Sequence, residues 1–249
     1  MQTQTTLGFA HFLAQADGLG KTLFVILLTM SVVSWYFIIT KAISKWRQRR
    51  ESGRFVDLFW NASSLEEVRN EITTHGANEP FSHLTSHALF AREHHERTGG
   101  GKLGEAGGLG DFLTRSMRKV IDEETAKLEN GLTVLATVGS TAPFVGLLGT
   151  VWGVYGALVS IGMSGAGTLD KVAGPVGEAL IMTGLGLGVA IPAVVAYNSF
   201  TRHNRLTLSS LDAFAHDLFA YLTTGAHGQQ TPGRLAGIGN KLRTLAQGV

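Results

Sequence analysis

The sequence contains no cysteine among its 249 residues. Disulfide bonds, thiolate metal ligands and cysteine nucleophiles are therefore excluded. Charged residues are also scarce, at 16% of the chain, whereas soluble domains contain about 25%. The first 16 residues carry no Lys or Arg, so the basic region of a secretory signal is missing and we expect no such signal. The net charge of +2 is too small to indicate a nucleic-acid partner.

Apolar residues are abundant, at 44% of the chain, and they are accompanied by 32 glycines. The mean hydropathy is positive. High hydrophobicity with little charge favours an integral membrane protein over a soluble domain. The glycines concentrate in the apolar stretches, where they allow helix backbones to approach closely.

Three apolar stretches are long enough to cross a bilayer as helices. The predicted membrane-spanning helices are residues 22–40, 131–162 and 175–201. The first stretch is close to the minimum length, and an interfacial or merely buried helix remains the alternative for it. The second is longer than the hydrocarbon core requires, so we expect it to tilt or to project beyond the bilayer.

The distribution of basic residues predicts the orientation of these helices. Lys and Arg follow the first and third spans and precede the second, which is the pattern of cytoplasmic segments. The segments expected outside, in the periplasm, are the N-terminus at 1–21 and the loop at 163–174. The segments expected in the cytoplasm are a helical domain at 41–130 and a helix and tail at 202–249.

Helical patterns also occur outside the spans. Residues 63–67 contain two overlapping capping boxes, so we expect a helix to start there. Another pattern begins at Asp111, and we expect it to continue into the second span without interruption. An amphipathic helix is expected after the third span, where apolar residues recur at helical spacing: Leu211, Phe214, Ala215, Leu218 and Leu222. No strand pattern competes, so the predicted fold class is all-α, with long cytoplasmic helical extensions.

Three polar residues inside the predicted spans are candidates for a proton pathway: Thr150, Thr183 and Glu178. An ionised carboxylate inside a bilayer is costly, so Glu178 is expected to face a bundle interior or an ion path. Because the two helices are antiparallel, residue counting places the Thr150 and Thr183 hydroxyls at similar depth. Two alternatives stay open: a membrane threonine often bonds its own i−4 carbonyl, and Glu178 could form a structural pair with Lys or Arg.

Small-residue faces accompany these polar groups on both helices. Glycines four residues apart allow close helix packing and could also face a pore. The pairs are Gly149 with Gly153 and Gly184 with Gly188, and Gly146 adds to the same smooth face.

Other chemistry has little support. His83, His87 and His94 share one helical face, but a solvated face explains them better than zinc binding, since no third ligand type is nearby. No phosphate loop, nucleophile elbow or metalloprotease motif occurs. We therefore expect no enzyme activity, no metal and no cofactor.

Two motifs resemble those of the MotA/TolQ/ExbB proton channel family. Residues 147–153 read Leu-Leu-Gly-Thr-Val-Trp-Gly, similar to the second-span signature of that family. Residues 177–180 read Gly-Glu-Ala-Leu and residues 186–194 read Gly-Leu-Gly-Val-Ala-Ile-Pro-Ala-Val, similar to its third-span signature. The chain departs from the pattern at residues 181–186, which are richer in glycine than the usual alanine-rich version.

The resemblance implies a homopentameric ring in a bacterial inner membrane. The ring would surround two copies of an ExbD-like or TolR-like single-span partner, whose intramembrane aspartate carries protons. Thr150 and Thr183 correspond to the polar ring that faces this aspartate, and Glu178 to the intramembrane glutamate of the family. Arg202 corresponds to a position for contacts with membrane lipids or a neighbouring subunit.

The favoured interpretation is an ExbB-type subunit that, with a TonB-like energy transducer, uses the proton gradient to drive import across an outer membrane. A TolQ-type subunit of an envelope-integrity motor is the alternative within the family. From a different class, the chain could be a membrane scaffold that conducts nothing. A secondary transporter is disfavoured, because three spans without an inverted repeat are too few.

Overall fold

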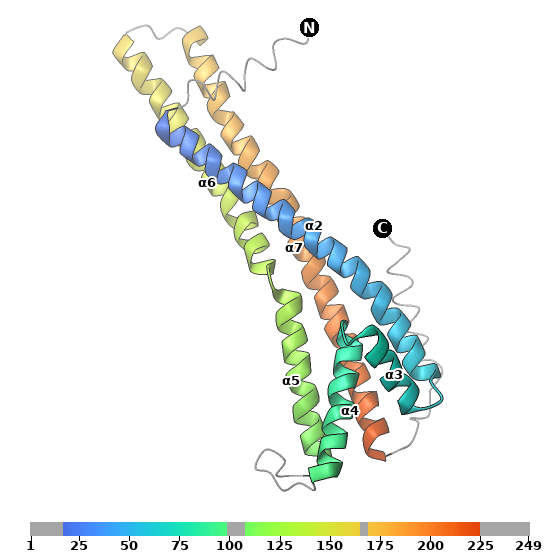
Figure 1. Ribbon diagram of the computed structural model, residues 1–249. Coiled ribbons are helices and arrows are strands. Elements are labelled where there is room, and N and C mark those ends of the chain that lie inside the picture. The colour runs from blue at the N-terminus through green and yellow to red at the C-terminus, as the bar shows by residue number, and fades with distance from the viewer. Residues whose placement is uncertain (1–16, 99–107, 165–168, 225–249) are drawn as a thin grey trace. The chain divides into compact units, whose positions relative to one another are not determined.

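The computed structural model of the protein describes residues 17–98, 108–164 and 169–224 (Figure 1). These residues form six α-helices and contain no strand, so the all-α prediction is confirmed for the described part of the chain. The chain divides into two compact units. The spanning unit comprises Met1–Ala42 and Gly131–Thr201, and the bundle unit comprises Ile43–Asn130 and Arg202–Val249.

The spanning unit is built from three helices. They are α6 (Leu132–Ser164), the first part of α2 (Gly18–Asn61) and the first part of α7 (Leu169–Thr224). Each of the three predicted spans lies in a helix that is long and apolar enough to cross a membrane, which confirms the count of three. In the most apolar window of each helix only 17–28% of the residues are buried.

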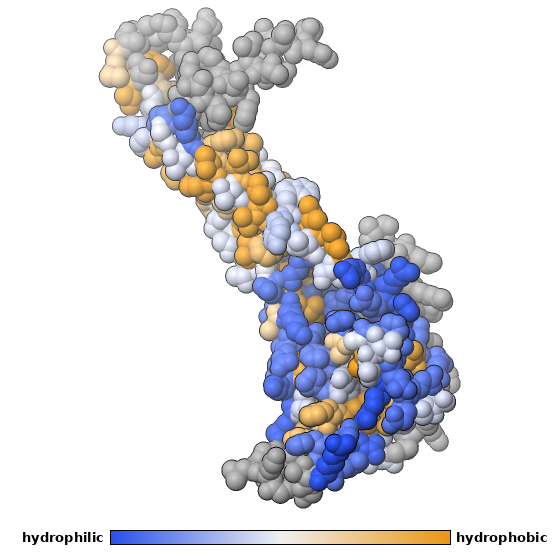
Figure 2. All heavy atoms as spheres, viewed as in Figure 1, coloured by the Kyte–Doolittle hydropathy of each residue, from blue (hydrophilic) through white to orange (hydrophobic). Residues whose placement is uncertain are grey.

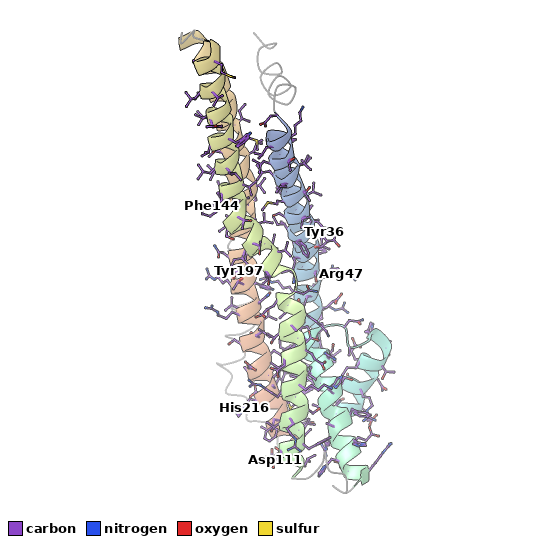
Figure 3. The ribbon with its side chains drawn as sticks, turned by 90° about the vertical axis from the view of Figure 1, so that its left-hand side faces the viewer. Tyr36, Arg47, Asp111, Phe144, Tyr197 and His216 are labelled. Atoms are coloured by element: carbon purple, nitrogen blue, oxygen red, sulfur yellow. The ribbon has the colours of Figure 1, made fainter. Side chains whose placement is uncertain are left out.

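The exposed surface of the spanning unit is apolar. Tyr36 on α2 is 63% exposed and Phe144 on α6 is 70% exposed, and both lie on outward faces (Figure 3). Hydrophobic residues cover much of the visible surface of this unit, whereas hydrophilic residues dominate that of the bundle unit (Figure 2). An apolar exterior of this extent is stable in lipid or against other apolar helices, but not in water.

Small and medium side chains fill the interior of the spanning unit. Leu27 of α2, Ala142 of α6 and Met182 of α7 are each 2% exposed or less and belong to one buried cluster. A second cluster contains Leu135 and Phe200, with Phe37 packed against it. The three helices are therefore packed against one another within a single chain.

The bundle unit contains α3 (Leu65–His75), α4 (Pro80–Thr98), α5 (Leu109–Glu129) and the remaining parts of α2 and α7. The start of α3 matches the capping-box prediction. Ser64 is the N-cap and its hydroxyl accepts a hydrogen bond from the Glu67 backbone N–H, at 3.3 Å. In return, the Glu67 carboxylate accepts a bond from the Ser63 backbone N–H at 2.9 Å. These bonds satisfy N–H groups that have no partner inside the helix.

The amphipathic stripe predicted on the last part of α7 forms the centre of the bundle core. All five predicted positions are buried: Leu211, Phe214, Ala215, Leu218 and Leu222. The Phe214 ring makes edge-on contacts with Phe59 of α2 and Phe81 of α4, at centroid distances of 5.1 and 5.4 Å. Residues from beyond the third span thus complete a core that begins before the second.

The expected uninterrupted helix from Asp111 into the second span is wrong. Helix α5 ends at Glu129 and α6 begins at Leu132. Between them, Gly131 adopts a positive φ of 78°, which disfavours residues with a β-carbon. A β-carbon on Gly131 would also lie 2.6 Å from the Phe37 ring of α2. Glycine is therefore required here on two counts.

Helices extend into the segment expected to be the periplasmic loop at 163–174, whose position outside the membrane stays a prediction. Helix α6 continues to Ser164 and α7 already begins at Leu169, and the four residues between them, 165–168, lie outside the described part. A helix that leaves a bilayer can continue in water, so a helix end and a membrane boundary need not coincide.

Candidate functional site

Thr150 of α6 and Thr183 of α7 meet inside the spanning unit. Their hydroxyl oxygens are 3.0 Å apart, which is hydrogen-bonding distance. Thr150 is 6% exposed, and Thr183 is partly exposed. The two residues are 33 positions apart in sequence, and residue counting placed them at similar depth, in agreement with this contact.

The alternative interpretation of a membrane threonine also holds for Thr150. Its hydroxyl lies 2.7 Å from the Leu147 carbonyl and 3.4 Å from the Gly146 carbonyl of its own helix. A hydroxyl has one proton to donate and two lone pairs that accept. If Thr150 donates to the nearer carbonyl, Thr183 must donate to Thr150. The lone pairs of Thr183 then remain available to a donor from outside the chain.

Close contact between α6 and α7 sets this hydroxyl distance. A β-carbon on Gly146 would lie 2.7 Å from the Met182 carbonyl oxygen, and one on Gly186 would lie 2.6 Å from the Ala142 carbonyl oxygen. Both distances are too short for real atoms, so the two backbones touch at this level. Thr183 follows Met182 directly, so this packing positions its hydroxyl.

The remaining predicted glycines fall into two groups. A β-carbon on Gly149 or Gly153 would lie 2.9 Å from a side-chain atom of α7, so both glycines pack between helices of this chain. Gly184 and Gly188 have no atom within 4 Å of a β-carbon position. They therefore make no close contact with the described part of the chain, and the pore-face interpretation is the one that stays open for them.

Glu178 and Arg202 are the two remaining predicted residues. Glu178 belongs to α7, but its side chain lies outside what the structure describes. Arg202 is exposed, one residue beyond the spanning unit. Their expected roles stay predictions.

One polar contact of the spanning unit was missed at the sequence level. The Trp152 indole N–H donates a hydrogen bond to the Asp17 carboxylate, across 135 positions of sequence. The other oxygen of Asp17 accepts from the Gly20 backbone N–H at 2.9 Å, at the start of α2. The contact therefore ties the first turn of α2 to α6. Its only sequence signal was that Asp17 is the single acid in the first 21 residues.

The three histidines predicted to share a face do not form a metal site. His83 and His87 are in contact, whereas His94 stacks on Phe90 further along α4. Over the described residues, no group of three or more His, Cys, Asp or Glu side chains is arranged to hold a metal ion.

Comparison with known proteins shows the relationships of the chain. Residues 77–213 match the profile of the MotA/TolQ/ExbB proton channel family. A protein named biopolymer transport protein ExbB from Xanthomonas campestris pv. campestris (strain B100) is 41% identical over 228 residues, covering 88% of this chain and 90% of the relative. An ExbB-named protein of Neisseria meningitidis is 38% identical, covering 80% and 90%. A Tol-Pal system protein TolQ of Pseudomonas aeruginosa is 32% identical, covering 81% and 86%.

Proposed function

Because the chain belongs to the MotA/TolQ/ExbB proton channel family, we propose that it is the ExbB-type subunit of an inner-membrane motor. This motor uses the proton motive force to energise TonB-dependent transport across the outer membrane. The ExbB-named relatives, at 38–41% identity over most of the chain, support this branch of the family. The alternative is a TolQ-type role in envelope integrity, because a TolQ-named relative is also similar to this chain, at 32% identity.

The hydrogen-bonded hydroxyls of Thr150 and Thr183 supply the polar chemistry for this proposal. Thr183 is partly exposed, and Thr150 supplies a partner for its proton. Thr183 can therefore accept a hydrogen bond from a protonated carboxyl group of a single-span, ExbD-like partner. When that carboxyl loses its proton, the Thr183 hydroxyl can turn and donate to the carboxylate instead, because a hydroxyl serves in both roles. A polar group of this kind stabilises either protonation state of an acid inside the membrane.

The assembly belongs to the same proposal. We place five copies of the chain in a ring around two partner helices, with Gly184 and Gly188 on the inner face. The absence of close neighbours at both glycines supports this placement, because a smooth face allows a partner helix to approach and to move. The apolar exterior of the spanning unit fits contacts with lipid and with neighbouring copies.

The orientation follows from the charges. We place the N-terminus in the periplasm and the C-terminus in the cytoplasm, so that the bundle unit lies in the cytoplasm. The basic residues that follow the first span, from Lys41 to Arg50, support this orientation.

Substitution of each threonine by valine tests the proposal, because valine keeps the shape and removes the hydroxyl. The measurement is energised uptake of an iron–siderophore complex in cells that lack the native subunit, with the native mass of the purified complex as the assembly control. Thr150→Val and Thr183→Val should each impair uptake and leave the complex intact. Thr141→Val is the matched control, since Thr141 is exposed on the same helix and its hydroxyl donates to the Thr137 carbonyl, at 2.7 Å.

Full uptake in both threonine variants would remove the hydroxyl pair from the mechanism. Normal uptake after deletion of the whole chain would move the protein to the TolQ branch. Sensitivity of the deletion strain to detergents, which reports envelope integrity, then tests that branch directly.

A further inference from the structure

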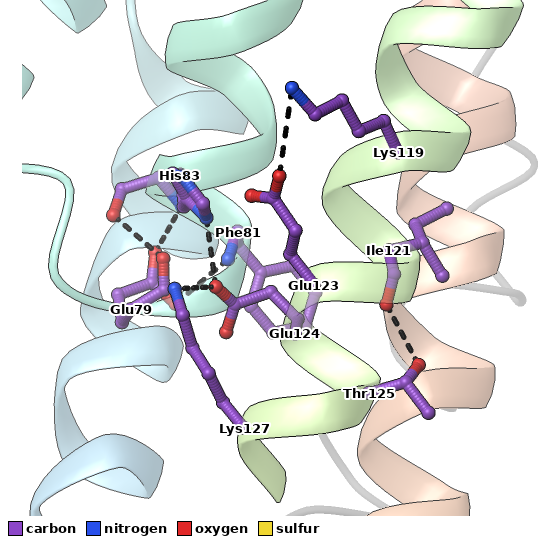
Figure 4. Close-up of polar contacts among 10 residues, drawn as sticks. Glu79, Phe81, His83, Lys119, Ile121, Glu123, Glu124, Thr125 and Lys127 are labelled. Carbon is purple, nitrogen blue, oxygen red and sulfur yellow. Dashed lines mark hydrogen bonds and ion pairs between the residues drawn. The ribbon is translucent and has the colours of Figure 1, made fainter.

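A cluster of titratable side chains lies between α4 and α5 in the bundle unit, and the function proposed above uses none of them (Figure 4). His83 Nδ1 is 2.8 Å from Glu124 Oε1, and Lys127 Nζ is 2.6 Å from the same oxygen. The side chains of His83 and Glu124 are only 17% and 8% exposed. Water therefore screens this contact weakly, and a change of charge there has a large effect.

Glu79 lies directly before α4 and begins the row of titratable groups. Its carboxylate accepts hydrogen bonds from the backbone N–H groups of Phe81 and Ser82, at the first turn of α4. It also accepts a bond of 2.6 Å from the Ser52 hydroxyl of α2. Burial raises the pKa of Glu79, while these bonds to the carboxylate act in the opposite direction.

His87 ends the row, one helical turn beyond His83. The two imidazole rings meet edge to face with centroids 4.7 Å apart. Burial lowers the pKa of His87, and positive charge on His83 lowers it further. Two protonated imidazoles at this distance repel each other, so the pair holds one proton more readily than two. His83 is the member of the pair that contacts a carboxylate.

Charged groups of both signs lie near the two histidines. The charged groups of the cluster are Glu79, directly before α4, and four side chains of α5: Lys119, Glu123, Glu124 and Lys127. From the other helices, α2 contributes the Ser52 hydroxyl, which bonds to Glu79, and α7 contributes the Phe214 ring, which packs against Phe81.

We propose that this cluster is a proton-binding site, in which His83 takes up one proton and thereby strengthens the contact between α4 and α5. Nδ1 faces Glu124 and donates to it, so the added proton binds at Nε2 and comes from the surrounding water. The neutral ring already donates a hydrogen bond to the Glu124 carboxylate, and protonation adds the attraction between opposite charges, which is strong because the contact is largely buried. Histidine is the side chain whose ordinary titration range lies near physiological pH.

The use of such a site rests on the proposed function. A proton channel releases protons on the cytoplasmic side, where the bundle unit is placed. Proton uptake by His83 would then make the contact between α4 and α5 stronger when the channel releases protons nearby. The experiment below measures proton binding in the bundle unit and does not depend on conduction.

Amide hydrogen exchange of the full-length protein in lipid nanodiscs tests the proposal. Exchange is followed at about pH 6 and about pH 8, with exchange times scaled to equalise the intrinsic chemical rates. In the wild type, α4 and the second half of α5 should be about fivefold to tenfold more protected at the lower pH. His83→Gln should abolish most of this difference, and Glu124→Gln should do the same from the other side of the contact.

His75→Gln is the matched control. His75 also contacts a glutamate, Glu71, at 3.2 Å, but within one helix and with 64% of its side chain exposed. This variant should keep the full pH difference in α4 and α5. Protection that is independent of pH in the wild type would overturn the proposal, as would a pH difference that survives in both His83→Gln and Glu124→Gln. Failure of siderophore uptake with a normal exchange profile would count against the proposed function alone.

Discussion

Gly146 and Gly186 face each other so closely that a β-carbon on Gly146 would lie 3.1 Å from the Gly186 Cα. This contact between α6 and α7 holds the backbones together at the level where the Thr150 and Thr183 hydroxyls meet. The close glycine contact therefore helps to set the distance between the two threonine hydroxyls.

The first prediction concerns this packing. Gly146→Ala places a methyl group 2.7 Å from the Met182 carbonyl oxygen, so one helix must shift. Overpacking of this kind costs about 1–3 kcal/mol of stability. Gly184→Ala is the control, because its β-carbon meets no atom within 4 Å and alanine favours a helix. Denaturation in detergent micelles should show a loss only for Gly146→Ala, and equal stability of the two variants would contradict the close-packing argument.

The second prediction concerns the carboxylate of the third span. Glu178→Gln replaces an acid by a neutral amide of similar shape, which costs less to bury. A role in proton transfer predicts that energised siderophore uptake is lost while the complex keeps its native mass. Glu129→Gln, at an exposed position of α5, should leave uptake unchanged. Normal uptake with Glu178→Gln would assign Glu178 a structural role, and normal uptake with all variants of Glu178, Thr150 and Thr183 would favour a passive scaffold.

The third prediction concerns the start of α3. Ser64→Ala removes the N-cap bond to the Glu67 backbone N–H and should cost about 1 kcal/mol. Ser63→Ala removes only an exposed hydroxyl contact with the Glu67 carboxylate, because the Ser63 backbone N–H still donates to it. Its effect should stay within about 0.5 kcal/mol. Urea denaturation, followed by helical circular dichroism, measures the difference, and the reverse order of the two variants would refute the assignment of the cap.

The fourth prediction concerns pH. Burial raises the pKa of Glu79, so the folded protein binds a proton at this carboxyl more tightly than the unfolded chain does. The stability from this proton is fully present below the ordinary glutamate pKa and is lost as the pH rises through the raised value. The free energy of unfolding of the wild type should therefore increase, relative to Glu79→Gln, as the pH falls from about 7 to about 4. A difference that is constant with pH would show that Glu79 has no raised pKa.

Local patterns predicted much of this fold. The capping box at 63–67 and the apolar spacing of Leu211 to Leu222 each involve residues within a few turns of one another, and the structure has both features. The shared depth of Thr150 and Thr183 also followed from residue counting, because antiparallel helices joined by a short connection have a fixed register.

Contacts between distant residues could not be predicted in the same way. The break at Gly131 depends on the Phe37 ring, which lies 94 positions earlier, and on a backbone conformation that no local pattern marked. His83 meets Glu124 across 41 positions, and Trp152 meets Asp17 across 135. In each case the packing of one helix against another selects the partner.

The bundle core has a consequence for how the protein is made. Val68, Leu84 and Leu113 precede the second span, whereas Leu211, Leu218 and Leu222 follow the third, and all six belong to one buried cluster. During synthesis, the part of the core that precedes the second span therefore keeps its apolar side chains exposed until the last part of α7 has been synthesised. The bundle can therefore close only after the second and third spans have been synthesised, and a chain that stalls near Thr201 would expose the apolar surface that quality-control proteases recognise.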